Sequence, residues 1–299
     1  AFVASMQQLR HSINAIVGYY DKLMQSPQRE LSSIVNALNG GYLAPSPGGD
    51  YIANPETLPT GRNLYSINAE TTPTKAAWDK GKKLAEDLLA DYKKRHNGEL
   101  PQKVSFSLWS SSFIESEGAT IAEIIYLLGC EPVRDMMGRV QDIRLIPMEQ
   151  LNRKRIDVVV QTSGQLRDLA ASRLYLIQKA VDLAAKETGE KDNEVAKGAV
   201  DAEKVLLEKG LSPNEARSLS TQRVFGGVNG NYGTGIQEMV ESGDRWEKES
   251  EIADVYLNNM GAIYGSSEQW GDFEAGLFEA ALQNVDAVVQ PRQSNSWGP

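Results

Sequence analysis

The sequence predicts an α/β protein: a parallel sheet flanked by helices, with a helical N-terminal segment and helical insertions. Between residues 104 and 186, runs rich in β-branched residues alternate with amphipathic runs, which is typical of strands joined by crossover helices. The segment RIDVVVQTSG at 155–164 is the clearest strand, because a charged start leads into valines and then into small polar residues. Hydrophobic residues make up 41% of the 299-residue chain, enough for a substantial core.

The N-terminal quarter of the chain differs in character from the rest. Residues 1–43 are expected to be a helical segment that ends a preceding domain, because apolar residues recur at helical spacing up to Gly40. Residues 44–74 hold five of the twelve prolines, and they are expected to form an ordered connector. Residues 75–299 are assigned to the α/β domain, which we expect to be a fragment of a much longer protein. Thr74 is in the position of an N-cap for its first helix.

Further elements of this domain follow from local patterns. Strands are expected at 104–109, 140–147 and 155–164, helices at 117–129 and after 164, and a short helix at MEQL (148–151). Charged helical segments follow at 190–220, and the pattern Ser212-Pro213 with Glu215 predicts a capping box. Further helices are expected near 234–242, 248–264 and 272–284, with DAVVQP as a final strand.

Composition excludes several classes of function. The net charge of −9 and pI of about 5.0 argue against general nucleic-acid binding. The single cysteine, Cys130, excludes an intrachain disulfide and a cysteine-based zinc site, and the two histidines exclude a multi-histidine site. The apolar runs are too short for a membrane span. The N-terminus lacks the pattern of a signal peptide, so a cytoplasmic location is expected.

The segment GGVNGNYGTG at 226–235 raises the question of a phosphate-binding loop. Its glycines follow neither the GxxxxGK[ST] nor the GxGxxG spacing, so we do not expect this chain to bind a nucleotide. One interpretation is a turn that needs glycine for its backbone conformation. The other is a nest of backbone N–H groups at a helix start, with Tyr232 as a stacking or hydrogen-bonding side chain.

Ligands of parallel sheets bind beyond the carboxyl ends of the strands, which directs attention to Trp109 and to Ser163. Ser163 is in the position of a nucleophile, but GxSxG is absent and neither histidine is near in sequence, so a hydrolase is not supported. Arg167 and Asp168 follow on the first turn of the next helix. They form either a local ion pair or a cationic site for a ligand carboxylate.

Other charged side chains are weaker candidates. Arg62 projects from the turn PTGRN, and Arg139 lies in a loop with Asp135; a structural role is the default for both. Glu115 and Glu117 lie near a predicted helix start, where carboxylates usually interact with the helix dipole, although they are also suited to proton transfer.

Several motifs in the same order resemble one family. The segments LPTGRNLYSIN, PTKAAW, LLGCEPVRDMMGRVQDIRLIPMEQLNRKRIDVVVQTSGQLRDL and RVFGGVNGNYGTGIQ are similar to the large subunit of cobaltochelatase and magnesium chelatase. The resemblance runs from about residue 31 almost to the C-terminus. Because several long motifs occur in order, it is far more specific than any one of them.

The resemblance implies a function. The large subunit binds a tetrapyrrole (a porphyrin, haem or corrin ring) for insertion of a divalent metal, Co or Mg, while separate ATPase motor subunits hydrolyse ATP. Arg62, Trp109, Arg139, Ser163, Arg167, Asp168 and Tyr232 are then candidates for binding the ring, Glu115 and Glu117 for proton transfer, and His11 for the metal. His11 lies outside the matched segments, and a surface or core histidine is the simpler interpretation of it.

Departures from the family pattern leave alternatives open. Chelatases tend to carry an acidic residue just after the glycine that corresponds to Gly118, where this chain has Ala119 and Thr120. The tail VVQPRQSNSWGP is similar to a divergent branch associated with haem utilisation. The alternatives to metal insertion are therefore release of iron from haem and a tetrapyrrole-binding module without turnover. The fragment alone is expected to be an incomplete enzyme.

Overall fold

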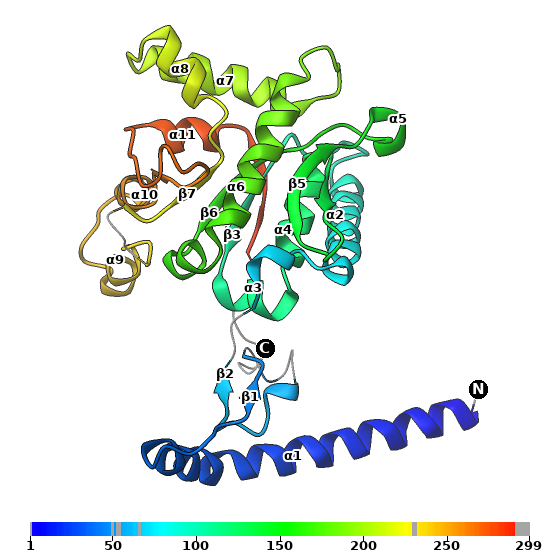
Figure 1. The fold of residues 1–299 in the computed structure, drawn as a ribbon. Coiled ribbons are helices and arrows are strands. Elements are labelled where there is room, and N and C mark those ends of the chain that lie inside the picture. Colours follow the sequence, from blue (N-terminus) through cyan, green and yellow to red (C-terminus); the bar gives the residue numbers. More distant parts are fainter. Residues whose placement is uncertain (1, 49–50, 52–54, 65–66, 229–231, 291–299) are drawn as a thin grey trace. The chain divides into compact units, whose positions relative to one another are not determined.

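The computed structural model describes residues 2–48, 51, 55–64, 67–228 and 232–290 (Figure 1). The described residues divide into two compact units, one within residues 1–67 and the other within residues 68–291. The boundary at residue 67 falls inside the segment 44–74 that was predicted as a connector.

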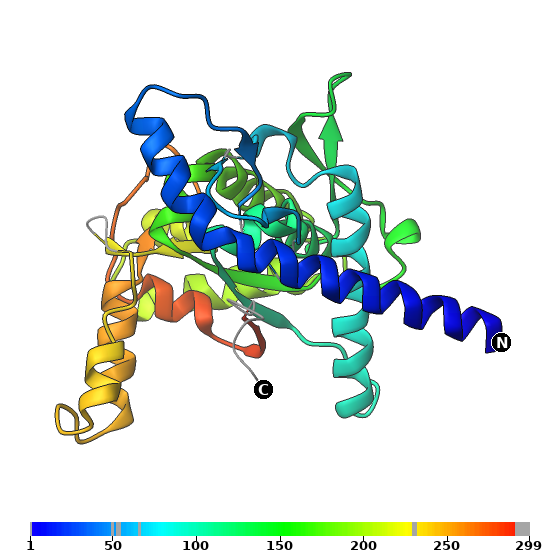
Figure 2. The ribbon, with the colours of Figure 1, turned by 90° about the horizontal axis from the view of Figure 1, so that it is seen from below.

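The first unit consists mainly of one long helix. α1 (Phe2–Leu38) contains Pro27 yet continues without interruption, and Figure 2 shows it in blue as a single element. Gly40, at φ +75°, follows its end, as the sequence predicted. Beyond it, β1 (Pro45–Ser46) pairs in parallel with β2 (Asn63–Leu64), and η1 (Pro55–Thr57) is a short turn of 3-10 helix.

The second unit is built on a five-stranded sheet in the order β8-β7-β6-β3-β9. Its strands are β3 (Lys103–Leu108), β6 (Asp157–Thr162), β7 (Val224–Gly226), β8 (Ala262–Ile263) and β9 (Val285–Val289). The pairs β9–β3, β3–β6 and β6–β7 are parallel, and only the edge pair β7–β8 is antiparallel. The predicted fold class and the predicted final strand are therefore confirmed.

Several helices of this unit begin at residues whose side chains cap them. The oxygens of Thr74, Ser163 and Ser212 each accept a hydrogen bond from a backbone N–H in the first turn of the helix that follows, and Ser212 and Glu215 form the predicted capping box. The helices are α2 (Lys75–Arg95), α3 (Ser110–Ser116), α4 (Ala119–Leu127), α5 (Met148–Leu151), α6 (Gly164–Lys186), α7 (Glu194–Glu208), α8 (Pro213–Leu219), α9 (Gln237–Ser242), α10 (Glu249–Asn259) and α11 (Leu277–Leu282), with the 3-10 turn η2 (Ala69–Thr71).

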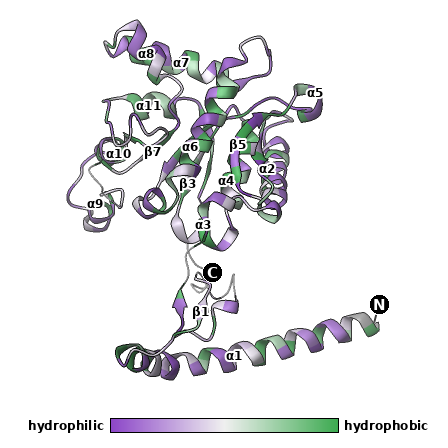
Figure 3. Ribbon diagram, viewed as in Figure 1, coloured by the Kyte–Doolittle hydropathy of each residue, from purple (hydrophilic) through white to green (hydrophobic). Residues whose placement is uncertain are grey.

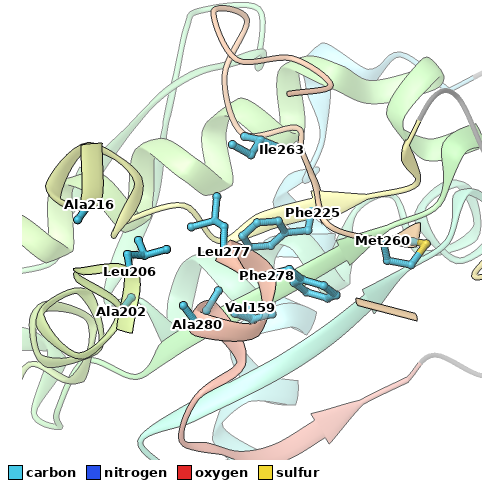
Figure 4. Packing of buried hydrophobic residues seen from close by; sticks show 11 residues of the cluster. Val159, Ala202, Leu206, Ala216, Phe225, Met260, Ile263, Leu277, Phe278 and Ala280 are labelled. Carbon is cyan, nitrogen blue, oxygen red and sulfur yellow. The ribbon is translucent and has the colours of Figure 1, made fainter. Parts of the chain in front are cut away.

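Helices cover the sheet on both faces. Val159 of β6 packs into an apolar cluster with Phe225 of β7 and with Leu277 and Phe278 of α11 (Figure 4). Successive strand residues point to opposite faces, and the valines on either side of Val159 are also fully buried. Both α4 and α6 contact β6, and Figure 3 shows apolar residues concentrated along these central strands and helices.

The structure corrects several predicted elements. The helix predicted at 117–129 is α4, which begins two residues later at Ala119, and it is preceded by α3, a helix that was not predicted. Glu117 (φ +52°) and Gly118 (φ +88°) are both left-handed and separate the two helices. The strand predicted at 140–147 is β5 (Val140–Leu145), but it does not join the main sheet; it pairs antiparallel with β4 (Cys130–Arg134), a strand that was not predicted.

Two C-terminal helices are shorter than predicted. The helix expected at 248–264 ends at Asn259, and the chain then enters β8 at Ala262. The helix expected at 272–284 is limited to α11, whose start follows Gly276 at φ +81°. A glycine stands at both boundaries, Gly261 after α10 and Gly276 before α11, and apolar residues continue beyond each, so the hydrophobic pattern alone does not mark the boundary.

Candidate functional site

The carboxyl ends of β3 and β6 lie side by side. Leu108 is paired with Thr162, so Trp109 and Ser163 leave the sheet at the same edge. The N–H of Ser163 donates to the carbonyl of Leu108 (2.9 Å), which extends the pairing by one residue. Two sequence-predicted residues are therefore brought together by the parallel register.

The hydroxyl of Ser163 serves as a helix cap. Its Oγ accepts a hydrogen bond from the N–H of Leu166 (3.2 Å) at the start of α6. Beside it, Ser110 Oγ donates to Gln165 Oε1 (2.9 Å), which ties the end of β3 to the same helix. The first turn of α6 is thus held rigidly at the edge of the sheet, with Ser163 in a structural position.

Tyr232 lies against this helix start. A Cβ atom built on Gly164 would be 2.7 Å from Cδ1 of Tyr232, so the ring occupies the space that only a glycine leaves. The Tyr232 hydroxyl donates to Oδ2 of Asp168 (2.6 Å), one turn further along α6. The side chain remains 56% exposed, which leaves much of the ring open to a ligand.

Arg167 is buried beneath Tyr232. Its Nη1 donates to the Tyr264 hydroxyl (2.9 Å) and to the carbonyl of Gly227 (3.3 Å), and its Nε donates to Asp168 Oδ1 (3.3 Å). The guanidinium carbon lies 4.8 Å from the ring centre of Tyr264 and 5.9 Å from that of Tyr232. Arg167 therefore fastens the glycine-rich segment to α6, in addition to forming the local ion pair that the sequence allowed.

The protonation states of this cluster follow from its hydrogen bonds. The hydrogen bond from Tyr232 lowers the pKa of the Asp168 carboxyl, with a smaller contribution from Arg167. The same bond raises the pKa of Tyr232 above its ordinary value. At neutral pH the site thus presents an ionised carboxylate held by a protonated phenol.

Trp109 contributes a buried donor to the same edge. Its indole Nε1 is enclosed and has no hydrogen-bond acceptor among the described residues. A hollow of about 10 Å³ lies between Trp109, Gln161, Ser163 and Tyr232. That volume holds about one water molecule, so a water or a ligand oxygen could satisfy the indole N–H.

The glycine-rich segment 226–235 has a packing role where it is described. A Cβ atom on Gly226 would lie 3.0 Å from side-chain atoms of both Thr162 and Tyr264, so close approach of β7 to its neighbours favours glycine there. Of the segment's described glycines, Gly235 has a positive φ, +76°. The predicted nest of N–H groups includes residues 229–231, which lie outside the described residues.

Two of the predicted arginines form local contacts of their own. Arg139, in the turn of the β4–β5 hairpin, donates from Nε to Asp135 Oδ2 (2.7 Å). Arg62 belongs to the first unit and donates from Nε to the carbonyl of Pro59 (3.1 Å) and from Nη2 to that of Glu56 (2.5 Å). Arg62 thus organises its own turn.

The predicted proton-transfer residues lie on α3 and directly after it, and the predicted metal residue lies on α1. Glu117 accepts a hydrogen bond from the Thr74 hydroxyl (2.7 Å), which links the α3–α4 junction to the start of α2. Glu115 is half-buried on α3. His11 is exposed on α1, and the residues described include no group of three or more His, Cys, Asp or Glu suited to hold a metal. Nothing tests these three assignments, which stay predictions.

Sequence analysis missed two members of the cluster. Tyr264 follows β8, and its hydroxyl donates to the carbonyl of Gly227 (2.7 Å) while its ring packs on Arg167. Gln161, next to the end of β6, accepts a hydrogen bond from the Tyr256 hydroxyl (2.5 Å). The strand-tip rule marks Gln161, but no local pattern marks Tyr264, because its partners are distant in sequence.

The fold and this edge define an α/β protein with a polar and aromatic site at its strand tips. The CobN/Magnesium Chelatase family model matches residues 3–299, and the chain belongs to this family. It is 34% identical to the aerobic cobaltochelatase subunit CobN of Sinorhizobium sp over 270 residues, covering 90% of this chain and 21% of the relative.

Other relatives agree. The chain is 32% identical over 296 residues to the chloroplastic magnesium-chelatase subunit ChlH of Oryza sativa subsp. indica, covering 96% of this chain and 21% of that protein. Among solved structures it is similar to the catalytic subunit of cobaltochelatase from Mycobacterium tuberculosis, with a TM-score of 0.79 and 30% identity, over 90% of this chain and 22% of that one. The chain therefore spans about a fifth of the length of these relatives. Within the described residues, no helix has both the length and the apolar character needed to cross a membrane.

Proposed function

We propose that this chain is part of a chelatase large subunit that handles a tetrapyrrole, and that the ring lies against the strand-tip cluster of Trp109, Asp168 and Tyr232. The observation that carries the proposal is Tyr232, an aromatic side chain half open to solvent yet fixed by Gly164 and Asp168. Membership of the CobN/Magnesium Chelatase family supports the class of ligand.

The chemistry of the cluster suits such a ring. A flat aromatic ligand gains stacking energy on the exposed face of Tyr232. Ionised Asp168 is an acceptor for a ring N–H group, and the buried indole N–H of Trp109 is a donor for a carboxylate oxygen that reaches it. Arg167 acts as a positioning residue, because its guanidinium already holds Gly227, Tyr264 and Asp168.

The peripheral carboxylates of the ring need cationic partners, and Arg139 and Arg62 remain the candidates. The Nε of Arg139 is occupied by Asp135, but its side chain is 47% exposed, which leaves the far end of the guanidinium accessible. Arg62 uses Nε and Nη2 for backbone carbonyls, so its contribution would come from Nη1.

The direction of the reaction is a second part of the proposal. Metal insertion is favoured by the family, with Co, Mg or Fe as the substrate metal, Glu115 and Glu117 as proton acceptors, His11 as a metal ligand, and ATP hydrolysed by separate motor subunits in the cytoplasm. Removal of iron from haem is the alternative, and Ala119 favours it, because this chain has no carboxylate there. Ala119 is buried against α2, where its carbonyl would meet a Cβ atom on Gly81 at 2.5 Å.

Absorbance titration of the full-length protein tests ring binding. A metal-free porphyrin, haem and a corrin are titrated separately into the wild-type protein, into Tyr232→Ala and into Tyr42→Ala, a matched control at a tyrosine that is 81% exposed in the first unit. Loss of the stacking face is expected to weaken binding roughly tenfold, from about 1–1.5 kcal/mol of aromatic interaction. Unchanged affinity in Tyr232→Ala would refute the assigned site.

Turnover assays separate the remaining alternatives. Insertion requires formation of a metallated ring from a metal-free one with motor subunits and ATP present, and dechelation requires release of iron and appearance of the metal-free porphyrin from haem. Binding without either product identifies a non-catalytic tetrapyrrole-binding module.

A further inference from the structure

The helix α1 carries an apolar stripe in two stretches, residues 3–24 and residues 31–38, whose large hydrophobic side chains are exposed. Thirteen large hydrophobic side chains along it are between 40% and 83% exposed. They are Val3, Met6, Leu9, Ile13, Ile16, Val17, Tyr20, Leu23, Met24, Leu31, Ile34, Val35 and Leu38. At 1.5 Å per residue, the 37-residue helix that carries both stretches is about 55 Å long.

The spacing of the stripe indicates what kind of surface it meets. From Met6 to Leu23, apolar residues alternate at intervals of three and four, which is the a/d pattern of helix-to-helix packing. Val17 and Met24 add apolar side chains at the neighbouring e position. A face of a, d and e positions is the width used by helices that pack into a bundle or a globular core, wider than a two-stranded coiled-coil seam.

The first unit cannot stabilise itself without such packing. Among the described residues up to 67, Leu58 is the only hydrophobic side chain in the buried core. A segment must bury apolar surface to offset the conformational entropy lost on ordering it. An exposed stripe of this size on a unit that lacks a core therefore marks a surface that is covered in the complete protein.

We propose that the apolar stripe of α1 packs against helices from the part of the full-length large subunit that lies outside these 299 residues. This chain spans about a fifth of its relatives, 21% of CobN and 21% of ChlH, so most of the polypeptide is available to supply the partner. The family match begins at residue 3, so the whole stripe lies within the region shared by the family.

A second copy of α1 suits the stripe less well. Two-stranded coiled coils are specified by charges at e and g positions that pair between the chains. Here the e positions hold Arg10, Val17 and Met24, and the g positions hold Ser5, Ser12 and Tyr19. Arg10 is the one charged residue among these six, and none of the g positions holds an acidic residue that could pair with it in a second copy. The stripe thus lacks the features that select a copy of itself.

Photo-crosslinking of the full-length protein tests the proposal. A benzophenone amino acid replaces Ile13 or Ile34 on the stripe, and Gln8, exposed on the opposite side of α1, serves as the matched control. An equal mixture of ¹⁴N- and ¹⁵N-labelled protein is irradiated, and the adducts are mapped by mass spectrometry. We expect adducts at both stripe positions to residues of the same polypeptide outside this chain, and no such adducts at Gln8.

Other outcomes overturn it. Mixed-isotope adducts would identify a second copy, adducts to residues 68–291 would place the partner within this chain, and the absence of adducts would leave the stripe in solvent. A second measurement uses Ile13→Asp, which is expected to lower the melting temperature of the full-length protein, whereas Gln8→Asp leaves it unchanged. Equal melting temperatures for both variants would also contradict the proposal.

Discussion

Glu123, on α4, is a carboxyl group buried against α2. It is 5% exposed, and burial raises its pKa to about 7. Between the ordinary pKa of 4.5 and about 7, the folded chain holds a proton that the unfolded chain has lost. Stability therefore falls as pH rises through this window and is lowest once Glu123 is ionised.

Replacement of Glu123 by glutamine removes the cost of ionising a buried carboxyl group. We expect Glu123→Gln to be more stable than the wild-type chain at pH 8, by at most about 3.4 kcal/mol for a pKa raised from 4.5 to about 7, and similar to it at pH 4.5. Urea denaturation of the 299-residue chain at both pH values measures this, with Glu208→Gln, at an exposed position, as the control. If the free energy of unfolding changed equally with pH in the wild type and in Glu123→Gln, the raised pKa of Glu123 would be contradicted.

At the scale of elements, α7 packs on β6 through a glycine. A Cβ atom on Gly198 would lie 2.1 Å from Oδ2 of Asp157. Asp157 cannot move aside, because it is buried and bonded to Arg223 Nε (3.1 Å) and to Lys103 Nζ (3.3 Å) at the amino ends of the strands. The network fixes the distance between α7 and the sheet.

Alanine substitution at two helical glycines measures how much the close approach of α7 to Asp157 matters for stability. Gly198→Ala is expected to lower the free energy of unfolding by about 2–4 kcal/mol, because it displaces a buried ion pair. Gly18→Ala in α1, where nothing lies within 4 Å, is expected to raise helix stability by up to about 1 kcal/mol. Calorimetry of the two variants compares them, and stabilisation by Gly198→Ala would show that α7 does not approach Asp157 closely.

Elements with local signals were predicted well, and those that depend on distant pairing were not. The caps at Thr74 and Ser212 lie within a turn of the helices they start, so the sequence contains all the information. The strand β4 contains Pro132 and two charged residues and becomes a strand only because β5 pairs with it. The junction between α3 and α4 at Glu117 likewise has a distant partner, because Glu117 accepts a hydrogen bond from Thr74, 43 residues away.

Some residues of the candidate site could be predicted from the sequence, and others depend on contacts that are distant in sequence. Trp109 and Ser163 were predicted from the general rule that ligands meet parallel sheets at strand ends, and the register of β3 and β6 brings them together. The burial of Arg167 was not predictable from its neighbours, because it depends on Tyr264, 97 residues further along the chain. Proximity of Tyr232 to Asp168 likewise depends on tertiary packing across 64 residues.

At the scale of the whole molecule, the apolar core is distributed unevenly. Among the described residues, every buried hydrophobic side chain except Leu58 belongs to the unit of residues 68–291. That unit also contains the complete five-stranded sheet and the helices that cover it. The second unit therefore has a core of its own, whereas the first unit has almost none among its described residues.

Separate expression of the two units tests whether the apolar core is distributed in this way. We expect residues 68–291 to fold alone with a cooperative thermal transition, because this unit contains the five-stranded sheet and every buried hydrophobic side chain of the described residues except Leu58. Residues 1–67 alone are expected to lack a cooperative transition, since a long amphipathic helix with an exposed stripe has no core to lose. Circular dichroism melting of the three proteins tests both expectations. A large loss of stability in residues 68–291 would mean that the first unit covers apolar surface of the second, and a cooperative transition in residues 1–67 would mean that this segment has a core of its own.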